Sequence, residues 1–434
     1  MFLLIGIAII VLLTAKFKVH AFFALLLACF IVGIGVGLPV SDVITISKDG
    51  FGNIMKSLGL IIILGTTLGI ILDHSGSTKV MAHFILKKTG KRNSSLAMSI
   101  TGFIVGLPIF CDSGYIVLSG LTRTFARKAG ISITIISISL ATSLYAVHCM
   151  VPPHPGVSAA AGIIGVDLGK LIIYGIIIAI PATIAGYLWA NFAGKNTITS
   201  TENENVFVED ENKNLPSVLG SFLPVIIPVL LIAFRSIIQF QKTSDTGWRH
   251  LFNITGDPVI ALSIGIVIAF ICYHGWNKND VAILLKDAAE KAGGILVIIG
   301  AGGAFGAILT ATKIGQQFSQ SLPLGSLGIL FPFLLTFILK TAQGSSTVAI
   351  ITAASILQPL LPALGLTSDQ GHLLCVLSMG AGSMMISHTN DAYFWVITKF
   401  SGLEMNTMLK VYSIATLLMG ITAFTMVYIL SLFI

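Results

Sequence analysis

Charged residues are scarce in this chain. Only 10% of its 434 residues are Asp, Glu, Lys or Arg, whereas soluble domains carry roughly 25%, and this shortage excludes a water-soluble fold. Apolar residues make up 55%, in runs that approach the roughly 20 residues of a membrane-spanning helix. The runs are 21–38, 57–72, 168–193, 218–234, 257–273 and 411–434. The sequence predicts an all-α polytopic membrane protein.

Cysteine is also rare, which excludes several kinds of site. The five cysteines are single, and no CxxC motif or zinc-type Cys and His spacing occurs. We expect free thiols and no metal or other cofactor. The net charge of +7 does not indicate a nucleic-acid partner, because Lys and Arg mainly set orientation in a membrane protein. The first fifteen residues lack a preceding basic stretch and a cleavage site, which predicts a retained helix.

One segment, 195–214, departs from the apolar pattern. It holds five of the eighteen acidic residues and almost no apolar run. The segment is expected to be a solvated linker. The alternative, an acidic loop that binds a cation, lacks the fixed ligand spacing of a calcium loop.

Two apolar regions, 95–121 and 327–362, have a centre rich in Gly, Pro and Ser between two apolar arms. Such a centre can form the tip of a re-entrant helical hairpin, because non-helical backbone is tolerated at membrane depth where protein or water covers it. For the first region, the alternative is a single helix kinked at Pro108.

The basic residues favour the hairpins. With both hairpins, and with 131–165 and 370–398 as single broken crossings, the chain crosses ten times. One face then collects seventeen Lys and Arg residues and the other six, so the first face is predicted to be cytoplasmic. A single crossing at 95–121 would separate Arg123 and Arg127 from the basic cluster at 79–92.

A weak internal repeat supports the same architecture. At an offset of 235 residues, 56–65 falls on 291–300, 106–113 on 341–348 and 151–156 on 386–391. Five crossings separate the two copies, so we expect two inverted repeats, the arrangement in which substrates bind near the membrane midplane between broken helices. The predicted parts are scaffold helices 1–56; a first repeat 57–165 with hairpin 95–121 and broken helix 131–165; scaffold helices 166–290 with linker 195–214; a second repeat 291–400 with hairpin 327–362 and broken helix 370–398; and a C-terminal helix 401–434.

Four polar breaks carry the candidate chemistry: 106–114, 151–156, 340–347 and 387–391. A broken helix leaves free N–H groups and a partial positive charge where its second half begins. Four such ends that converge would form an anion site.

Charged side chains within the membrane are costly and indicate function by default. Asp112, Asp391 and Lys340 are the candidates, although Asp112 can instead cap a hairpin arm and Lys340 can extend to an interface. His154 and His388 lie in the breaks and titrate near neutral pH, so either can carry a proton, unless its role is structural. His148 is an additional candidate because it precedes a break.

Enzyme motifs are not convincing. The glycines of 300–306 resemble a dinucleotide loop but lie in an apolar helix, where glycines permit close helix packing. No feature ties the serines at 113, 345 and 346 to a catalytic His and carboxylate.

The four breaks resemble the signature segments of the gluconate permease family, the gluconate:proton symporters. The likeness extends from about residue 1 to 434. It rests on four segments in order: GLPIFCDSGYIVLSGL at 106–121, HCMVPPHPGVSAAAG at 148–162, KTAQGSSTVAIITAAS at 340–355 and GAGSMMISHTNDAYFWV at 380–396.

The resemblance implies a carrier of the bacterial inner (cytoplasmic) membrane that imports gluconate or a related small hydroxy-carboxylate with protons. Relatives that carry D-serine, glycerate or hydroxybutyrate are the alternative substrates, and a membrane-embedded enzyme or a channel is the alternative class. It also implies a homodimer in which a transport domain moves against a fixed scaffold, as in an elevator.

The expected site follows from the breaks and the resemblance together. The substrate-binding candidates are Asp112, Ser113, Gly114, Lys340, Gln343, Gly344, Ser345, Ser346, Thr347, Asn390 and Asp391. The proton-coupling candidates are Asp112, His154, His388 and Asp391. N–H groups and hydroxyls at Ser113, Gly114, Ser345 and Ser346, helped by Lys340, are expected to hold the carboxylate. Gln343, Asn390 and Asp391 are expected to bind the hydroxyls.

Overall fold

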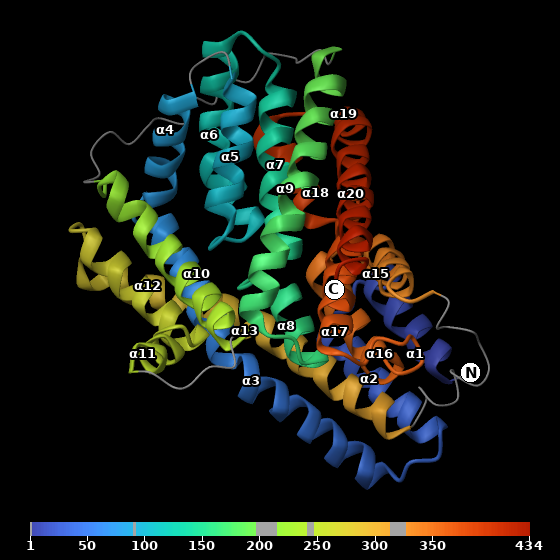
Figure 1. Ribbon diagram of the computed structural model, residues 1–434. Helices are drawn as coiled ribbons and strands as arrows, with labels where there is room; N and C mark the ends of the chain where they lie inside the picture. Colours follow the sequence, from blue (N-terminus) through green and yellow to red (C-terminus); the bar gives the residue numbers. More distant parts are fainter. Residues whose placement is uncertain (1, 90–92, 197–214, 241–246, 313–326) are drawn as a thin grey trace.

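Helices form every regular element in the described part of the chain, which the computed structural model gives as residues 2–89, 93–196, 215–240, 247–312 and 327–434 (Figure 1). Six helical stretches there are long and apolar enough to cross a membrane: Val40–His74, Ile133–Ile164, Leu168–Ala193, Val218–Ile238, Lys278–Ala311 and Met405–Ser431. The prediction of an all-α polytopic membrane protein is confirmed. Most of the expected linker 195–214 lies outside the described residues.

The helices fall into three groups along the chain. The first comprises α1 (Phe2–Val11), α2 (Ala21–Gly35), α3 (Val40–His74), α4 (Ser77–Thr89), α5 (Ser94–Gly106), α6 (Cys111–Ala129), α7 (Ile133–Met150), α8 (Pro155–Ile164) and α9 (Leu168–Ala193). The second comprises α10 (Val218–Phe240), α11 (Gly247–Thr255) and α12 (Pro258–Cys272). The third comprises α13 (Lys278–Ala311), α15 (Leu330–Gln343), α16 (Ser346–Leu357), α17 (Asp369–Met384), α18 (Ala392–Ser401), α19 (Met405–Met408) and α20 (Ile414–Ser431).

Local capping explains where several helices begin and end. Gly130 adopts φ 66°, a left-handed conformation that terminates α6. Ser132 then accepts a hydrogen bond from the Thr134 N–H and starts α7. The second arm of the first hairpin therefore extends to Ala129, beyond the expected end at 121.

The chain turns back on itself at two short links. Residues 107–110 join α5 to α6, and both helices pack against each other and against α4 and α7 (Figure 1). A single helix kinked at Pro108 would not bring both arms onto α7. In the second link, Gly344 ends α15 and Ser345 begins α16, which packs back against α15.

Helix α13 packs along α3, where small residues permit close contact. A Cβ atom on Gly50 would lie 2.6 Å from the Gly303 carbonyl oxygen, and a Cβ on Gly303 would lie 2.7 Å from the Gly50 carbonyl oxygen. Side chains at either position would force the helices apart. The glycines of 300–306 thus serve packing, as expected.

The helix bounds repeat at the predicted offset. Shifted by 235 residues, the first residues of α5, α6, α7, α8 and α9 fall within two residues of the starts of α15, α16, α17, α18 and α19. The expected boundaries at 56/57 and 290/291 divide the continuous helices α3 and α13. The opposite orientation of the two copies stays a prediction.

Elements of one copy pack against elements of the other. The second arm of the first hairpin, α6, contacts α18, whereas the second arm of the other hairpin, α16, contacts α8. The two long halves of the broken helices, α7 and α17, also touch. These exchanged contacts place the four breaks in one central region.

Cysteine labelling tests the membrane topology. In a variant that lacks the native cysteines, Lys88→Cys and Arg127→Cys are expected to react with an impermeant reagent from the same face, because the first hairpin returns to its side of entry. Thr367→Cys, which follows the second hairpin, is expected to react from the opposite face. All three residues are exposed. Labelling of Lys88→Cys and Arg127→Cys from opposite faces would contradict the first hairpin.

Candidate functional site

The four predicted breaks are linked by four contacts, each between one break or its helix and the next, and we call this arrangement the ring. The first contact joins the first hairpin to the first broken helix. The Nε2 atom of His154, in the break between α7 and α8, lies 2.7 Å from the Gly106 carbonyl oxygen at the end of α5. The His154 Nδ1 atom lies 3.3 Å from Nδ1 of His148 on α7. Both imidazoles are buried.

The second contact joins the first broken helix to the second hairpin. The Thr347 hydroxyl, in the first turn of α16, lies 3.5 Å from the His148 Nε2 atom. Nearby, Gly156 in the first turn of α8 lies so close to α16 that a Cβ would be 3.0 Å from the Thr347 Cα. The starts of α8 and α16 are therefore adjacent.

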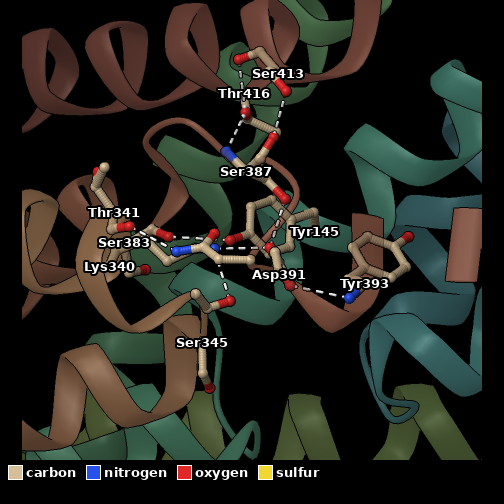
Figure 2. A network of polar contacts seen from close by, with 12 residues as sticks. Tyr145, Lys340, Thr341, Ser345, Ser383, Ser387, Asp391, Tyr393, Ser413 and Thr416 are labelled. Atoms are coloured by element: carbon tan, nitrogen blue, oxygen red, sulfur yellow. Dashed lines mark hydrogen bonds and ion pairs between the residues drawn. The ribbon is translucent and has the colours of Figure 1, made fainter. Parts of the chain in front are cut away.

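The third contact joins the second hairpin to the second broken helix through a buried ion pair (Figure 2). The Lys340 ammonium donates to Asp391 Oδ2 at 2.7 Å and to the Gly344 carbonyl oxygen at 3.1 Å. The side chain of Lys340 is fully buried and that of Asp391 is 8% exposed. The Asn390 side chain also donates to the Thr341 carbonyl oxygen at 2.6 Å. An isolated charge would be costly here, so each partner compensates the other.

The fourth contact closes the ring between the second broken helix and the first hairpin. Tyr393 on α18 packs edge to face against Tyr115 on α6, with ring centroids 6.1 Å apart. Asp112 lies in the first turn of α6 and Asp391 caps α18, so the two carboxylates belong to helices that contact each other. Lys340 directly neutralises Asp391.

Asp391 is fixed by further hydrogen bonds (Figure 2). Its Oδ2 accepts from the Ser387 hydroxyl at 2.5 Å, and its Oδ1 accepts from the Tyr393 N–H at 3.0 Å, which caps α18. Ser387 is in turn held by the last helical segment: its N–H donates to Thr416, and its carbonyl oxygen accepts from Ser413. The break is rigidly anchored to the C-terminal helix.

The backbone of this break is strained. Ile386 adopts φ 43°, a region that β-branched residues rarely enter. Hydrogen bonds on both sides of the neighbouring Ser387 peptide hold the conformation. Strain of this kind is concentrated at functional sites.

The helix starts around the ring differ in how they are capped. Ser345 caps α16 through its bond from the Val348 N–H, and Asp391 caps α18. Phe110 and His154 precede α6 and α8 without a side-chain cap. The first N–H groups of α6 and α8 therefore have no partner in their helices and can bind an anion.

The expected donors of the first hairpin are not equivalent. Asp112 and Ser113 lie in the uncapped first turn of α6 and are partly buried. The Gly114 N–H instead donates to the Phe110 carbonyl oxygen at 2.9 Å. Gly114 permits close packing against α7, because a Cβ there would approach the Leu144 side chain to 3.0 Å.

Several polar atoms at the second hairpin tip are buried without a hydrogen bond in the described structure. They are the side-chain nitrogen and oxygen of Gln343, the side-chain Oδ1 atom of Asn390 and the Thr341 hydroxyl. Unsatisfied buried amides are costly and rare. Their placement supports the expectation that Gln343 and Asn390 bind the hydroxyl groups of a ligand.

The structure brings most predicted residues together, but the predicted histidines differ in their contacts. His154 is in the ring, whereas the partly buried side chain of His388 makes no hydrogen bond to the described residues. His148 is more central than expected from its position on an apolar helix. Tyr145 and Tyr393 were not singled out from the sequence. The Tyr145 hydroxyl donates to the Ser383 carbonyl oxygen, and the Tyr393 hydroxyl donates to the Ala141 carbonyl oxygen. These partners are far away in the sequence, so only the structure reveals the two tyrosines.

The chain is similar to known membrane transport proteins over nearly its whole length. A family model for GntP family permeases matches residues 1–433. Gluconate permease of Pseudomonas aeruginosa is 32% identical over 434 residues, covering 98% of this chain and 96% of that protein. A D-serine transporter of Escherichia coli K12 is 32% identical over 437 residues, covering 99% and 97%. An inner membrane permease of the same organism is 31% identical over 437 residues, covering 97% and 96%.

Two solved transporter structures share the fold. The YdaH transporter of Alcanivorax borkumensis superposes with a TM-score of 0.62 at 14% identity, covering 91% of this chain and 89% of that one. Neisseria gonorrhoeae MtrF, described as one of a class of antimetabolite efflux pumps, superposes with a TM-score of 0.66 at 16% identity, covering 90% and 84%. At these identities, the likeness concerns the fold alone.

Proposed function

The chain belongs to the GntP family of permeases and is a multi-pass membrane transporter rather than an enzyme, and from this premise we propose that it imports gluconate or a related small hydroxy-carboxylate with protons. The observation that carries the proposal is the ring formed by the four helix breaks, two in the hairpins and two in the broken helices. It combines unpaired helix N-termini, which suit a carboxylate, with buried unpaired amide groups, which suit hydroxyls.

The carboxylate is proposed to bind at the helix starts of the two hairpins. The N–H groups of Asp112 and Ser113 and the first turn of α16, at Ser345, Ser346 and Thr347, supply the donors. Gly114 and Gly344 let the hairpin tips pack closely against Leu144 and Asn390, which keeps the helix starts together. Lys340 is paired with Asp391, so its ammonium is proposed to attract the carboxylate electrostatically from within the ion pair and not as a free cation.

Hydroxyl groups are proposed to bind at the second hairpin tip. Gln343 offers a donor and an acceptor without partners, and Asn390 offers a free carbonyl oxygen. Asp391 already has three hydrogen-bonding partners, so its proposed role is to hold the second broken helix against Lys340 beside the hydroxyl site. D-serine has only one hydroxyl, and a relative of equal identity carries it, so the substrate panel includes D-serine, glycerate and hydroxybutyrate.

Proton coupling follows from the charge of the substrate. Moving a monoanion into a negative interior costs about 2.3 kcal/mol per 100 mV, whereas a monoanion with one proton moves no net charge. The titratable groups proposed to carry the proton are Asp112, His154 and Asp391 in the ring, and His388, which lies in the second broken helix without a side-chain hydrogen bond to the described residues of the ring. We further propose a homodimer in the bacterial inner membrane that works by an elevator motion, as the family resemblance implies.

Uptake into proteoliposomes tests this function. An interior more alkaline by about one pH unit supplies about 1.4 kcal/mol per proton. With the membrane potential clamped at zero, this step is expected to sustain about tenfold accumulation of labelled gluconate if one proton accompanies each anion. Addition of a protonophore is expected to abolish the accumulation.

Other results would replace the proposal. Equilibration without accumulation would indicate a channel. Accumulation of D-serine but not of gluconate under the same gradient would assign the alternative substrate. Uptake driven by a sodium gradient at equal pH would exclude the proton as the coupling ion.

A further inference from the structure

The two buried histidines form a hydrogen-bonded chain whose direction is fixed by one backbone group. The Gly106 carbonyl oxygen can only accept a hydrogen bond, so His154 Nε2, 2.7 Å away, carries a proton. In a neutral imidazole, the other nitrogen is then an acceptor. His154 Nδ1 therefore accepts from His148 Nδ1, 3.3 Å away, and this contact places the proton of His148 on its own Nδ1.

One lone pair remains open in this chain. With Nδ1 of His148 protonated, its Nε2 is an acceptor, and its nearest hydrogen-bonding neighbour is the Thr347 hydroxyl at 3.5 Å. An incoming proton can attach only at this nitrogen, whichever of the two imidazoles holds the charge afterwards. Thr347 must then change from donor to acceptor, and its hydroxyl hydrogen becomes free to turn elsewhere.

Thr347 lies where a carboxylate would bind. It is in the first turn of α16, at the second hairpin tip, beside the first turn of α8. Once the Thr347 hydroxyl no longer donates to His148, it can donate to an anion bound at these helix starts. The protonated pair also adds positive charge beside the same position.

We infer that His148 Nε2 is the atom at which the coupling proton enters, and that the Thr347 hydroxyl switches direction and so links proton uptake to carboxylate binding. The inference rests on the proposed proton-coupled transport and adds a residue outside the coupling set listed above. It also assigns Thr347 a specific role in that transport.

The surroundings make the two ligands depend on each other. His154 is the titratable partner of His148 in the break, and the buried charged pair on the neighbouring second hairpin is Lys340 with Asp391. Tyr145, one turn earlier on α7, stacks on its ring, and Cys149 follows it in the chain. Because Lys340 is already paired with Asp391, a cation on the buried histidine pair has no counter-charge of its own and costs free energy unless an anion is bound. Proton and anion therefore favour each other's binding, and the coupling is reciprocal.

Gluconate affinity as a function of pH tests the inference on the purified protein. Wild-type affinity is expected to rise up to about tenfold for each unit that the pH falls, since one proton binds with the anion. In His148→Asn, which keeps an N–H near the Nδ1 position but cannot accept the proton, the slope is expected to disappear. Thr347→Val removes the hydroxyl and is expected to flatten it similarly, whereas Thr347→Ser restores it.

The control is His83→Gln, at an exposed histidine on α4, and it is expected to keep the wild-type slope. In vesicles, His148→Asn is expected to lose pH-driven accumulation and to retain exchange of gluconate between equally loaded faces. A wild-type pH slope in His148→Asn, or a flat slope in Thr347→Ser, would overturn the inference. Absence of any gluconate uptake by the wild type would instead count against the proposed function.

A measurement without substrate separates the two further. Nitrogen NMR of histidine-labelled protein in liposomes, assigned by loss of signals in His148→Asn, is expected to show His148 protonated on Nδ1 and His154 on Nε2 at neutral pH. On acidification, His148 Nε2 is expected to gain a proton. The opposite tautomers would overturn the inference even if transport is proton-driven.

Discussion

Replacing Lys340 with methionine is expected to destabilise the protein by about 3–5 kcal/mol and to abolish transport. The substitution keeps the apolar stem but leaves the buried Asp391 carboxylate without its cation, and it removes a donor from the Gly344 carbonyl oxygen. The Asp391 side chain is 8% exposed. Its uncompensated charge therefore favours unfolding or a rearrangement of the hairpin tip. Denaturation of the purified protein in detergent measures the change.

A surface ion pair provides the matched control. Lys286 lies 3.8 Å from Glu290, with side chains that are 75% and 66% exposed, so Lys286→Met is expected to change stability by about 0.5 kcal/mol or less. The double variant Lys340→Met with Asp391→Asn is expected to recover most of the stability, since no charge remains, but not the transport. A loss below about 1 kcal/mol for Lys340→Met alone would show that Asp391 is compensated by other groups.

Gly344→Ala is expected to inactivate the transporter almost completely. Gly344 adopts φ 79°, which costs an alanine about 1–2 kcal/mol, and a Cβ there would also overlap the backbone carbonyl oxygen of Asn390. The hairpin tip must therefore move away from the second broken helix, which separates Lys340 from Asp391. Gluconate uptake and thermal stability are both measurable in this variant.

Gly165→Ala isolates the effect of the overlap. Gly165 has a similar φ of 87° but faces open space, so it is expected to show only the backbone cost and to keep transport. Equal losses in the two variants would mean that backbone conformation, rather than contact with Asn390, makes Gly344 necessary.

The breaks themselves were predictable because their causes are local. Pro108 lies in the link between α5 and α6, and Gly344 supplies the left-handed residue that ends α15, so the sequence marks both hairpin tips. The end of α6 was predictable from Gly130 but was placed too early, because the arm continues through a basic, less apolar segment.

The partners across the site were not predictable in the same way. Lys340 and Asp391 are 51 residues apart, and no periodicity relates them; their positions under the 235-residue offset, Val105 and Gly156, carry no charge. His148 lies on an entirely buried apolar helix, and only the Gly106 carbonyl and Thr347, 199 residues away, give its ring a direction. Such pairings are set by how helices pack, which a single sequence does not encode locally.

The exchanged packing of α6 with α18 and of α8 with α16 bears on how the chain can evolve. The helices recur as two similar sets, but neither set forms a complete site. In each half, the start of one helix packs against a helix of the other half. A duplication that created such a chain could not afterwards diverge freely in one copy. Substitutions near Thr347 are constrained by His148 in the other half, and those near Tyr393 by Tyr115. Compensating changes among descendants are therefore expected between the halves, at positions that the repeat does not pair.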